Sequence, residues 1–242
     1  MPATQPITFR PFGATHAVVL VVFVVFTCAI VALRRRARGE RGRRRVDGAL
    51  AVLTGLTWLV VNGWWFLPGH FDPAFSLPLH VCDVTGLVVP VVLVWPRRWL
   101  RAILYFWGLG LSLQGFIQPD LRDGPHLPGF WLFWANHYVV VGLSIYDLAA
   151  RAYRPRWRDF AVSVVAGLGY VAVVLPIDVI FGLNYGYLGP GRPHQPTLID
   201  HLGPWPWRLG VIFGLVALVW VVMVLPWELS RRRANTPAVS PR

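Results

Sequence analysis

The sequence alternates between long apolar runs and shorter connections that are either basic or rich in proline and glycine. Each run is close to the roughly 20 residues that a helix needs to cross about 30 Å of hydrocarbon. The pattern therefore predicts an all-α polytopic membrane protein, a bundle of seven transmembrane helices. The predicted spans are residues 14–33, 46–66, 77–95, 98–117, 129–151, 160–183 and 207–229.

Composition agrees with this pattern, because 55% of the residues are hydrophobic and only 14% are charged. Soluble domains carry about 25% charged residues. A chain of 242 residues holds one such bundle and has no room for a second large domain. We expect an extracytoplasmic N-terminal segment at 1–13, a transmembrane domain at 14–229 and a basic cytoplasmic tail at 230–242. The first run lacks a cleavage pattern and is expected to be retained as a span.

The net charge of +12 helps to predict the membrane topology and does not indicate a function class. In a soluble protein it would suggest nucleic acid as a partner, but here nineteen of the 23 basic residues, all arginine, fall in alternate connections and the C-terminal tail. Arginine-rich connections face the cytoplasm. We therefore expect no nucleic-acid partner, and we expect a multi-pass protein of the cell membrane with its N-terminus outside and its C-terminus in the cytoplasm.

With this orientation, most polar residues of the spans fall in the outer half of the membrane, while the inner half is Val, Leu, Ile and Phe. At about 1.5 Å per residue, Cys82 lies about 6 Å below the outer boundary and His137 about 12 Å below it. Polar groups at membrane depth indicate a functional site. We expect them to line one outer cavity formed by His80, Cys82, Asp83, Gln114, Gln118, Asn136, His137, Asp178, Asn184 and Tyr185.

Helical geometry separates these candidates. His80 and Cys82 lie about 200° apart around a helix, so His80 is a poor base for Cys82, whereas His80 and Asp83 can pair. Cys82 shares its helix face with Gly86, which predicts open space beside the sulfur. Gln114 and Gln118 lie four residues apart on a small or polar stripe that continues back to Gly110, as a cavity wall requires.

A thiol is mostly protonated at neutral pH and needs a base before it can act as a nucleophile. His137 lies on another span at nearly the same depth as Cys82, so we interpret the two as a nucleophile and its base. Asn136 either donates to a substrate carbonyl or holds two helices together. The structural alternatives are that Cys82 is a packing residue, that Asp178 caps a broken helix, and that Gln114 and Gln118 join helices.

Several of these segments resemble the YwaF-like family of integral membrane proteins, whose animal relative is transmembrane protein 164. The resemblance covers about residues 45–230. It is carried by Leu77-Pro78-Leu79-His80-Val81-Cys82-Asp83, by residues 114–119, by Ala135-Asn136-His137-Tyr138, by Asn184-Tyr185-Gly186-Tyr187-Leu188, and by Trp205-Pro206-Trp207.

The resemblance implies a seven-helix fold similar to intramembrane lipid hydrolases. It also implies acyl transfer onto lysophospholipids through a Cys and His pair, which match Cys82 and His137. We therefore expect a thiol-dependent acyltransferase or acyl-ester hydrolase in the outer half of the membrane. Its partners would be membrane lipids, a phospholipid or lysophospholipid and an acyl donor, and we expect no metal or other cofactor.

Two other functions remain open from the sequence. One is a zinc-dependent lipid hydrolase with His80, Asp83, His137 and His201 around the metal, although no close ligand spacing such as H-x-x-H occurs. The other is a ligand-binding or transport protein that performs no chemistry, because fold alone does not decide function.

Overall fold

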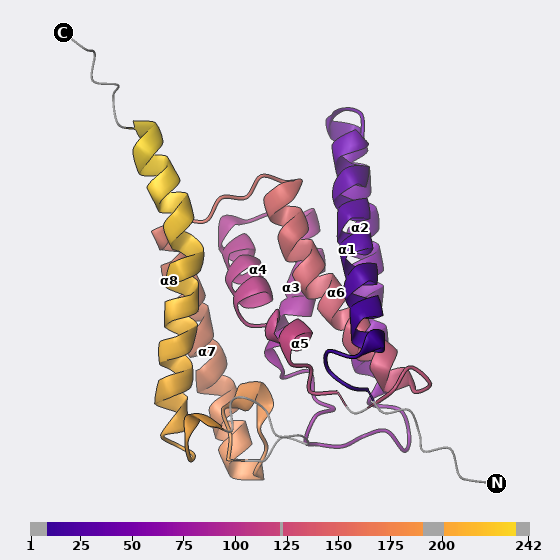
Figure 1. The fold of residues 1–242 in the computed structure, drawn as a ribbon, viewed down its shortest axis with the longest axis vertical. Helices are drawn as coiled ribbons and strands as arrows, with labels where there is room; N and C mark the ends of the chain where they lie inside the picture. The colour runs from indigo at the N-terminus through magenta and orange to yellow at the C-terminus, as the bar shows by residue number, and fades with distance from the viewer. Residues whose placement is uncertain (1–8, 122, 191–200, 236–242) are drawn as a thin grey trace.

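The computed structural model describes residues 9–121, 123–190 and 201–235, and this part of the chain is entirely helical. Helix α6 runs through the middle, with α1 and α2 on one flank and α7 and α8 on the other (Figure 1). The elements are α1 (Ala14–Arg36), α2 (Gly39–Trp64), α3 (Val81–Val94), α4 (Arg98–Gly110), α5 (Gln114–Ile117), α6 (Pro128–Ala149), α7 (Trp157–Phe181), η1 (Tyr185–Tyr187) and α8 (Arg208–Asn235).

Five helical segments of the described chain are long and apolar enough to cross a membrane: α1, α2, the α4–α5 segment, α7 and α8. Their outer faces expose large apolar side chains such as Val21 on α1 and Leu168 on α7. Apolar surface along whole helices is unfavourable in water but is favourable in contact with lipid. The protein is therefore a membrane protein.

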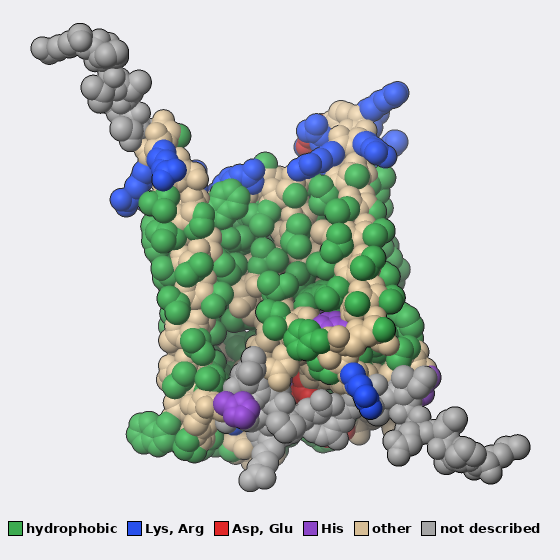
Figure 2. Space-filling model, in the orientation of Figure 1, with side chains coloured by type: hydrophobic (Ala, Val, Ile, Leu, Met, Phe, Trp, Pro, Cys, Tyr) green, Lys and Arg blue, Asp and Glu red, His purple; other side chains and the backbone are tan. Residues whose placement is uncertain are grey.

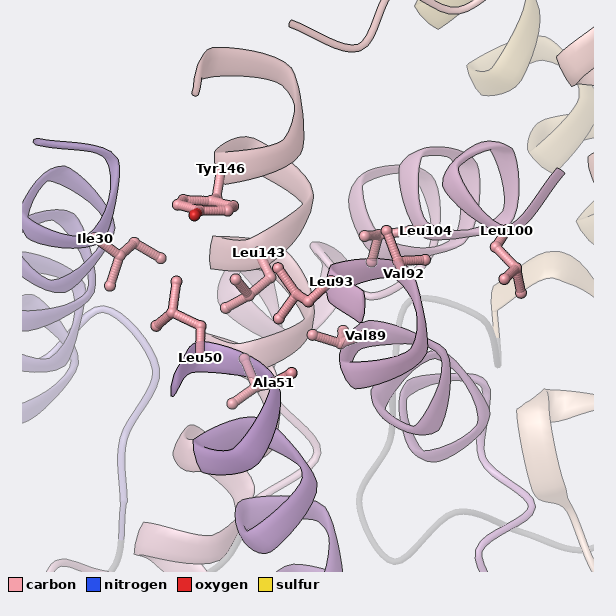
Figure 3. Close-up of a cluster of buried hydrophobic side chains, with 11 residues drawn as sticks. Ile30, Leu50, Ala51, Val89, Val92, Leu93, Leu100, Leu104, Leu143 and Tyr146 are labelled. Atoms are coloured by element: carbon pink, nitrogen blue, oxygen red, sulfur yellow. The ribbon is translucent and has the colours of Figure 1, made fainter. Parts of the chain in front are cut away.

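The two remaining predicted spans are the internal helices. Helix α3 has 14 residues, and α6 is long enough to cross a bilayer but carries the polar side chains Asn136, His137 and Asp147. Most residues of α6 are buried, because α1, α2, α3 and α4 all pack against it. An apolar core fills the space between these helices, with Leu50, Val89 and Leu143 among its members (Figure 3). Burial by neighbouring helices explains why α6 tolerates polar residues.

Four predicted boundaries were wrong. Helix α2 begins at Gly39, seven residues before the predicted start at 46, so much of the first arginine-rich connection is helical. Helix α3 begins at Val81 rather than at residue 77, because the chain from Leu77 to His80 forms a turn that includes Pro78. The predicted helix 98–117 is interrupted at Leu111–Leu113, so α5 is a separate short helix held by i→i−3 hydrogen bonds. Helix α8 continues to Asn235, six residues beyond the predicted end at 229.

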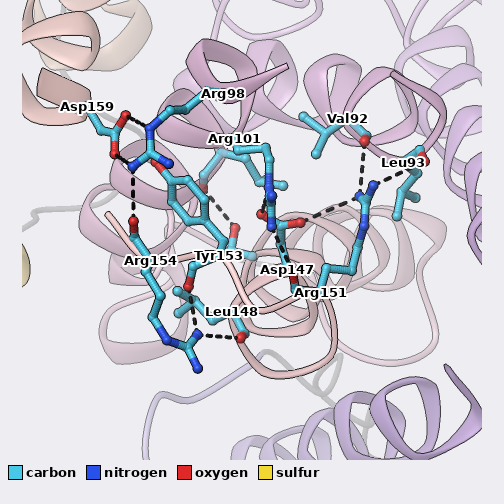
Figure 4. Close-up of polar contacts among 12 residues, drawn as sticks. Val92, Leu93, Arg98, Arg101, Asp147, Leu148, Arg151, Tyr153, Arg154 and Asp159 are labelled. Carbon is cyan, nitrogen blue, oxygen red and sulfur yellow. Dashed lines mark hydrogen bonds and ion pairs between the residues drawn. The ribbon is translucent and has the colours of Figure 1, made fainter. Parts of the chain in front are cut away.

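Arginine side chains gather at one end of the bundle, above flanks covered by apolar side chains (Figure 2). Several of them are not merely exposed topology signals. Asp147 on α6 pairs with Arg101 on α4 at 2.8 Å and with Arg151 at 3.5 Å (Figure 4). Arg151 also pairs at 3.5 Å with Asp47 on α2.

Asp47 completes this buried network by accepting hydrogen bonds from Arg34 on α1 at 3.0 Å and from the hydroxyl of Tyr146 on α6. Asp47 and Asp147 are 7% and 3% exposed. The sequence analysis treated this half of the bundle as apolar and missed the network. Its acidic residues link α1, α2, α4 and α6 near their arginine-rich ends, and such groups are costly unless paired.

Candidate functional site

The first turn of α3 carries Cys82 and Asp83, at the opposite end of this helix from Val92 and Leu93, whose carbonyls accept hydrogen bonds from Arg151 (Figure 4). His80 is the N-cap residue, with an extended backbone, and Asp83 occupies the third helical position. The Asp83 carboxylate interacts with the backbone N–H of His80, as acidic residues at this position commonly do. The indole N–H of Trp58 on α2 donates to the Asp83 carbonyl at 2.8 Å. These contacts fix the first turn of α3 against α2.

Asp83 also joins α3 to α6. Its carboxylate oxygen Oδ1 accepts a hydrogen bond from Asn136 Nδ2 at 2.9 Å, and both residues are buried. The same oxygen accepts a longer contact of 3.8 Å from Sγ of Cys82, which is half-buried and free of any disulfide. Of the two roles left open for Asn136, the structure shows the link between two helices, α3 and α6.

Gly86 does not provide the open space that the sequence suggested. A Cβ atom at this position would lie 3.0 Å from Asn136 Oδ1 and 3.0 Å from Trp58 Cδ1. Glycine is instead needed because α2 and α6 approach α3 closely here. The prediction of room beside the sulfur on this face is therefore wrong.

His137 is buried and held in a defined orientation. Its Nδ1 lies 2.8 Å from the carbonyl oxygen of Phe133, and its ring stacks on the Phe133 ring at 4.1 Å. Because a carbonyl can only accept, Nδ1 carries the proton and Nε2 keeps its lone pair. Nε2 faces the backbone of α5: a Cβ atom at Gly115 would lie only 2.3 Å from it.

Cys82 and His137 are thus on adjoining turns of α3 and α6, and within the described chain they do not share a hydrogen bond. The imidazoles of His80 and His137 lie close enough to interact electrostatically. The predicted proton transfer from the Cys82 thiol to His137 remains a prediction.

The segment before α3 is held by two tyrosines. The Tyr185 hydroxyl donates to the Pro73 carbonyl at 2.7 Å and accepts from the Leu77 N–H at 3.0 Å, and its ring lies 4.7 Å from that of His80. Burial raises the pKa of Tyr185 to about 12, so this hydroxyl stays protonated and can donate at neutral pH.

Tyr170 on α7 was missed by the sequence analysis. Its hydroxyl donates to the Leu79 carbonyl at 2.6 Å. Tyr170 is the residue of α7 that brings a polar group to the turn before Cys82. The available signal was a phenol within an otherwise apolar run, which also occurs at ordinary membrane interfaces.

Asp178 and Asn184 organise the loop after α7 rather than approach Cys82. Helix α7 is not broken at Pro176, so Asp178 does not cap a broken helix; its carboxylate accepts from the N–H of Tyr185 in η1 at 3.0 Å. The Asn184 side-chain oxygen accepts from the Gly189 N–H at 3.1 Å and from Arg208 at 3.5 Å. Through Tyr185, this loop supports the turn that leads into α3.

Gln114 and Gln118 do not form the continuous stripe with Gly110 that the sequence suggested. Gln114 begins α5 and Gln118 follows its last residue, whereas Gly110 ends α4 before the break. Both glutamines are half-buried near the turn of α5 that packs against His137.

The zinc set predicted as an alternative is not assembled. His201 is exposed, and in the part of the chain that the structure describes no three His, Cys, Asp or Glu side chains are grouped so that they could hold a metal ion. The donor geometry therefore gives the zinc hydrolase no support.

Comparison with known proteins identifies a family. Neither the curated proteins nor the solved structures include a match to this chain. The model of the TMEM164 family matches residues 11–224, which include both internal helices and the turns that carry Cys82 and His137. The chain belongs to the TMEM164 family.

Proposed function

We propose that this membrane protein transfers or hydrolyses the acyl chains of phospholipids and lysophospholipids, with Cys82 as nucleophile and His137 as base. The observation that carries the proposal is the hydrogen bond between Asp83 and Asn136 at 2.9 Å. It joins the turn that bears the thiol to the turn that bears the imidazole. Membership of the TMEM164 family agrees with a function in the membrane.

In the proposed reaction, Nε2 of His137 takes the thiol proton, and the Cys82 thiolate forms a bond with an acyl carbonyl carbon of the donor lipid. The ester C–O bond breaks, and the departing lyso-lipid oxygen takes the proton from the imidazolium. The hydroxyl of a lysophospholipid, or water, then gives its proton to His137 and attacks the thioester, which releases the thiolate.

The resting contacts give the other residues supporting roles. In this structure the thiol hydrogen-bonds to Asp83 and Nε2 of His137 faces Gly115 on α5. Proton transfer therefore requires both the sulfur and the imidazole to leave these contacts. Asn136 is a positioning residue, since its amide holds Asp83. The half-buried Cys82 suits a nucleophile that a lipid must reach.

The proposed topology has seven spans, with the N-terminus outside and the C-terminus in the cytoplasm. It is supported by the arginines gathered at one end of the bundle (Figure 2). A green fluorescent protein fused after Arg242 is expected to fluoresce in cells, and alkaline phosphatase fused at the same point is expected to be inactive. An active phosphatase and a dark fluorescent fusion would reverse the orientation and put Cys82 on the cytoplasmic side.

The function is tested with purified protein, a phosphatidylcholine donor and a radiolabelled lysophospholipid acceptor. Wild type is expected to form labelled phospholipid or to release fatty acid, whereas Cys82→Ala is expected to lose this activity. Cys28→Ala is the matched control, because Cys28 is an exposed thiol on the lipid-facing side of α1 and is expected to be dispensable. Full activity in Cys82→Ala, or no turnover in wild type, would contradict the proposal and favour a binding protein.

A further inference from the structure

An apolar groove lies between α2 and α3, near the arginine-rich end of the bundle. Its volume is about 470 Å³, within the range of small-molecule sites. Gly48 leaves it open, since a Cβ atom there would have no neighbour within 4 Å, whereas at Gly55 the two helices come together at Pro90. The groove is lined by Gly48, Ala51, Val52, Pro90, Val91, Val94 and Trp95.

A cationic hollow of about 400 Å³ lies directly above this groove on α2, lined by Glu40, Arg41, Arg44 and Arg45. Arg44 pairs with Glu40 at 3.3 Å. Arg41 and Arg45 are exposed and have no ion-pair partner among the described residues. Their charges are therefore available to an anion from outside the protein.

The arginines and the groove share one face of α2. Positions 41, 45, 48 and 52 are spaced by four, three and four residues, which places them in one stripe along the helix. Arg45 precedes Gly48 by three residues, about 4.5 Å along the axis. Arg43 lies about 160° to 200° away from this stripe, on the other side of the helix.

We propose that this surface binds one anionic phospholipid, with its phosphate between Arg41 and Arg45 and an acyl chain in the groove below. Charge complementarity selects the headgroup, because two unpaired arginines stand directly over an apolar, lipid-facing groove. Arg97 stacks on Trp95 at 4.7 Å, which marks this level as the membrane interface.

This lipid site is distinct from the candidate active site. Cys82 lies in the first turn of α3 and Val94 at its last, about 18 Å apart along the helix. The ester groups of a lipid held by Arg41 and Arg45 therefore lie far from the thiol. The inference does not depend on the proposed acyl chemistry.

Native mass spectrometry of the detergent-solubilised full-length protein tests the site, with phosphatidylglycerol and phosphatidylcholine of the same acyl chains as probes. Wild type is expected to bind one phosphatidylglycerol in preference to phosphatidylcholine. Replacing Arg41 and Arg45 together by alanine is expected to weaken phosphatidylglycerol binding about 30-fold, given the usual contribution of two basic residues at a membrane surface. Arg43→Ala is expected to have a much smaller effect.

Gly48→Leu tests the contribution of the groove while Arg41 and Arg45 are kept. The larger side chain fills open space and improves helix propensity, so the variant is expected to fold and to lose binding of both lipids. Gly169→Leu, at an exposed position on α7 that also has no neighbour within 4 Å, is the control and should bind as wild type does. Equal binding of the two lipids by wild type, or unchanged phosphatidylglycerol binding in both Gly48→Leu and the double arginine variant, would overturn the proposal.

Discussion

Replacing His137 by alanine is expected to slow acylation of Cys82 by about 10² to 10⁴-fold at neutral pH, the usual contribution of a general base. The loss arises because the Phe133 carbonyl holds Nδ1 of His137, which leaves the lone pair of Nε2 to accept the thiol proton. The rate of acylation by a water-soluble thioester, followed from pH 6 to pH 10, measures the effect.

The pH profile distinguishes a base from a structural residue. If His137 acts as a base, the variant should regain much of its rate at high pH, where the thiol ionises without help. If His137 only supports packing, the deficit should be similar at every pH. His70→Ala is the control, because His70 lies in an exposed turn after α2. A wild-type rate in His137→Ala at neutral pH would remove His137 from the mechanism.

Gly115→Ala tests the same imidazole without removing it. A Cβ atom at Gly115 would lie 2.3 Å from Nε2, so the ring must move away from its stacked position on Phe133. The variant should therefore resemble His137→Ala in its neutral-pH rate. Gly63→Ala on α2 is the matched control, since its Cβ would have no neighbour within 4 Å.

The largest expected loss of stability comes from Asp147→Ala. Asp147 is 3% exposed and is the common partner of Arg101 and Arg151. Removing it leaves Arg101 without the carboxylate it pairs with and leaves Arg151 with Asp47 alone, and breaking a buried pair on one side costs about 3–5 kcal/mol. Thermal unfolding in detergent, followed by tryptophan fluorescence, should show a much lower midpoint.

Glu40→Ala provides the comparison for Asp147→Ala. The Glu40 and Arg44 pair is exposed, so its removal should change the midpoint little. Equal midpoints for the Asp147→Ala and wild-type proteins would show that the network in Figure 4 does not stabilise the bundle.

The helices were predictable because long apolar runs favour them, and a helix lies at each predicted position, although only five helical segments of the described chain are long and apolar enough to cross a membrane. Their local ends were not. The break at Leu111–Leu113 directly follows Gly110, but glycines also occur inside unbroken helices, as Gly142 does in α6. The start of α3 depends on Tyr185, more than a hundred residues away. Tertiary contacts of this kind leave no local pattern in a sequence.

The depth of the candidate site in the membrane was predictable from the sequence, but the contacts between its side chains were not. Counting residues from the membrane boundary placed Cys82, Asn136 and His137 in one layer, and the bond from Asn136 to Asp83 joins two helices of that layer. Helical spacing alone does not show which group the thiol faces, nor that Gly115 lies against Nε2. The pairing of Asp47 with Arg151 was missed for the same reason, because sequence spacing does not show which charged residues of distant segments pair.

The most direct test is the intact mass of the protein after brief incubation with a phospholipid donor and rapid acid quenching. The proposed mechanism predicts a mass increase of one acyl group, localised to Cys82, removed by neutral hydroxylamine, absent in Cys82→Ala and present in Cys28→Ala. Acyl turnover by a protein whose Cys82 never carries the acyl group, or an adduct found on Cys28 instead, would contradict it.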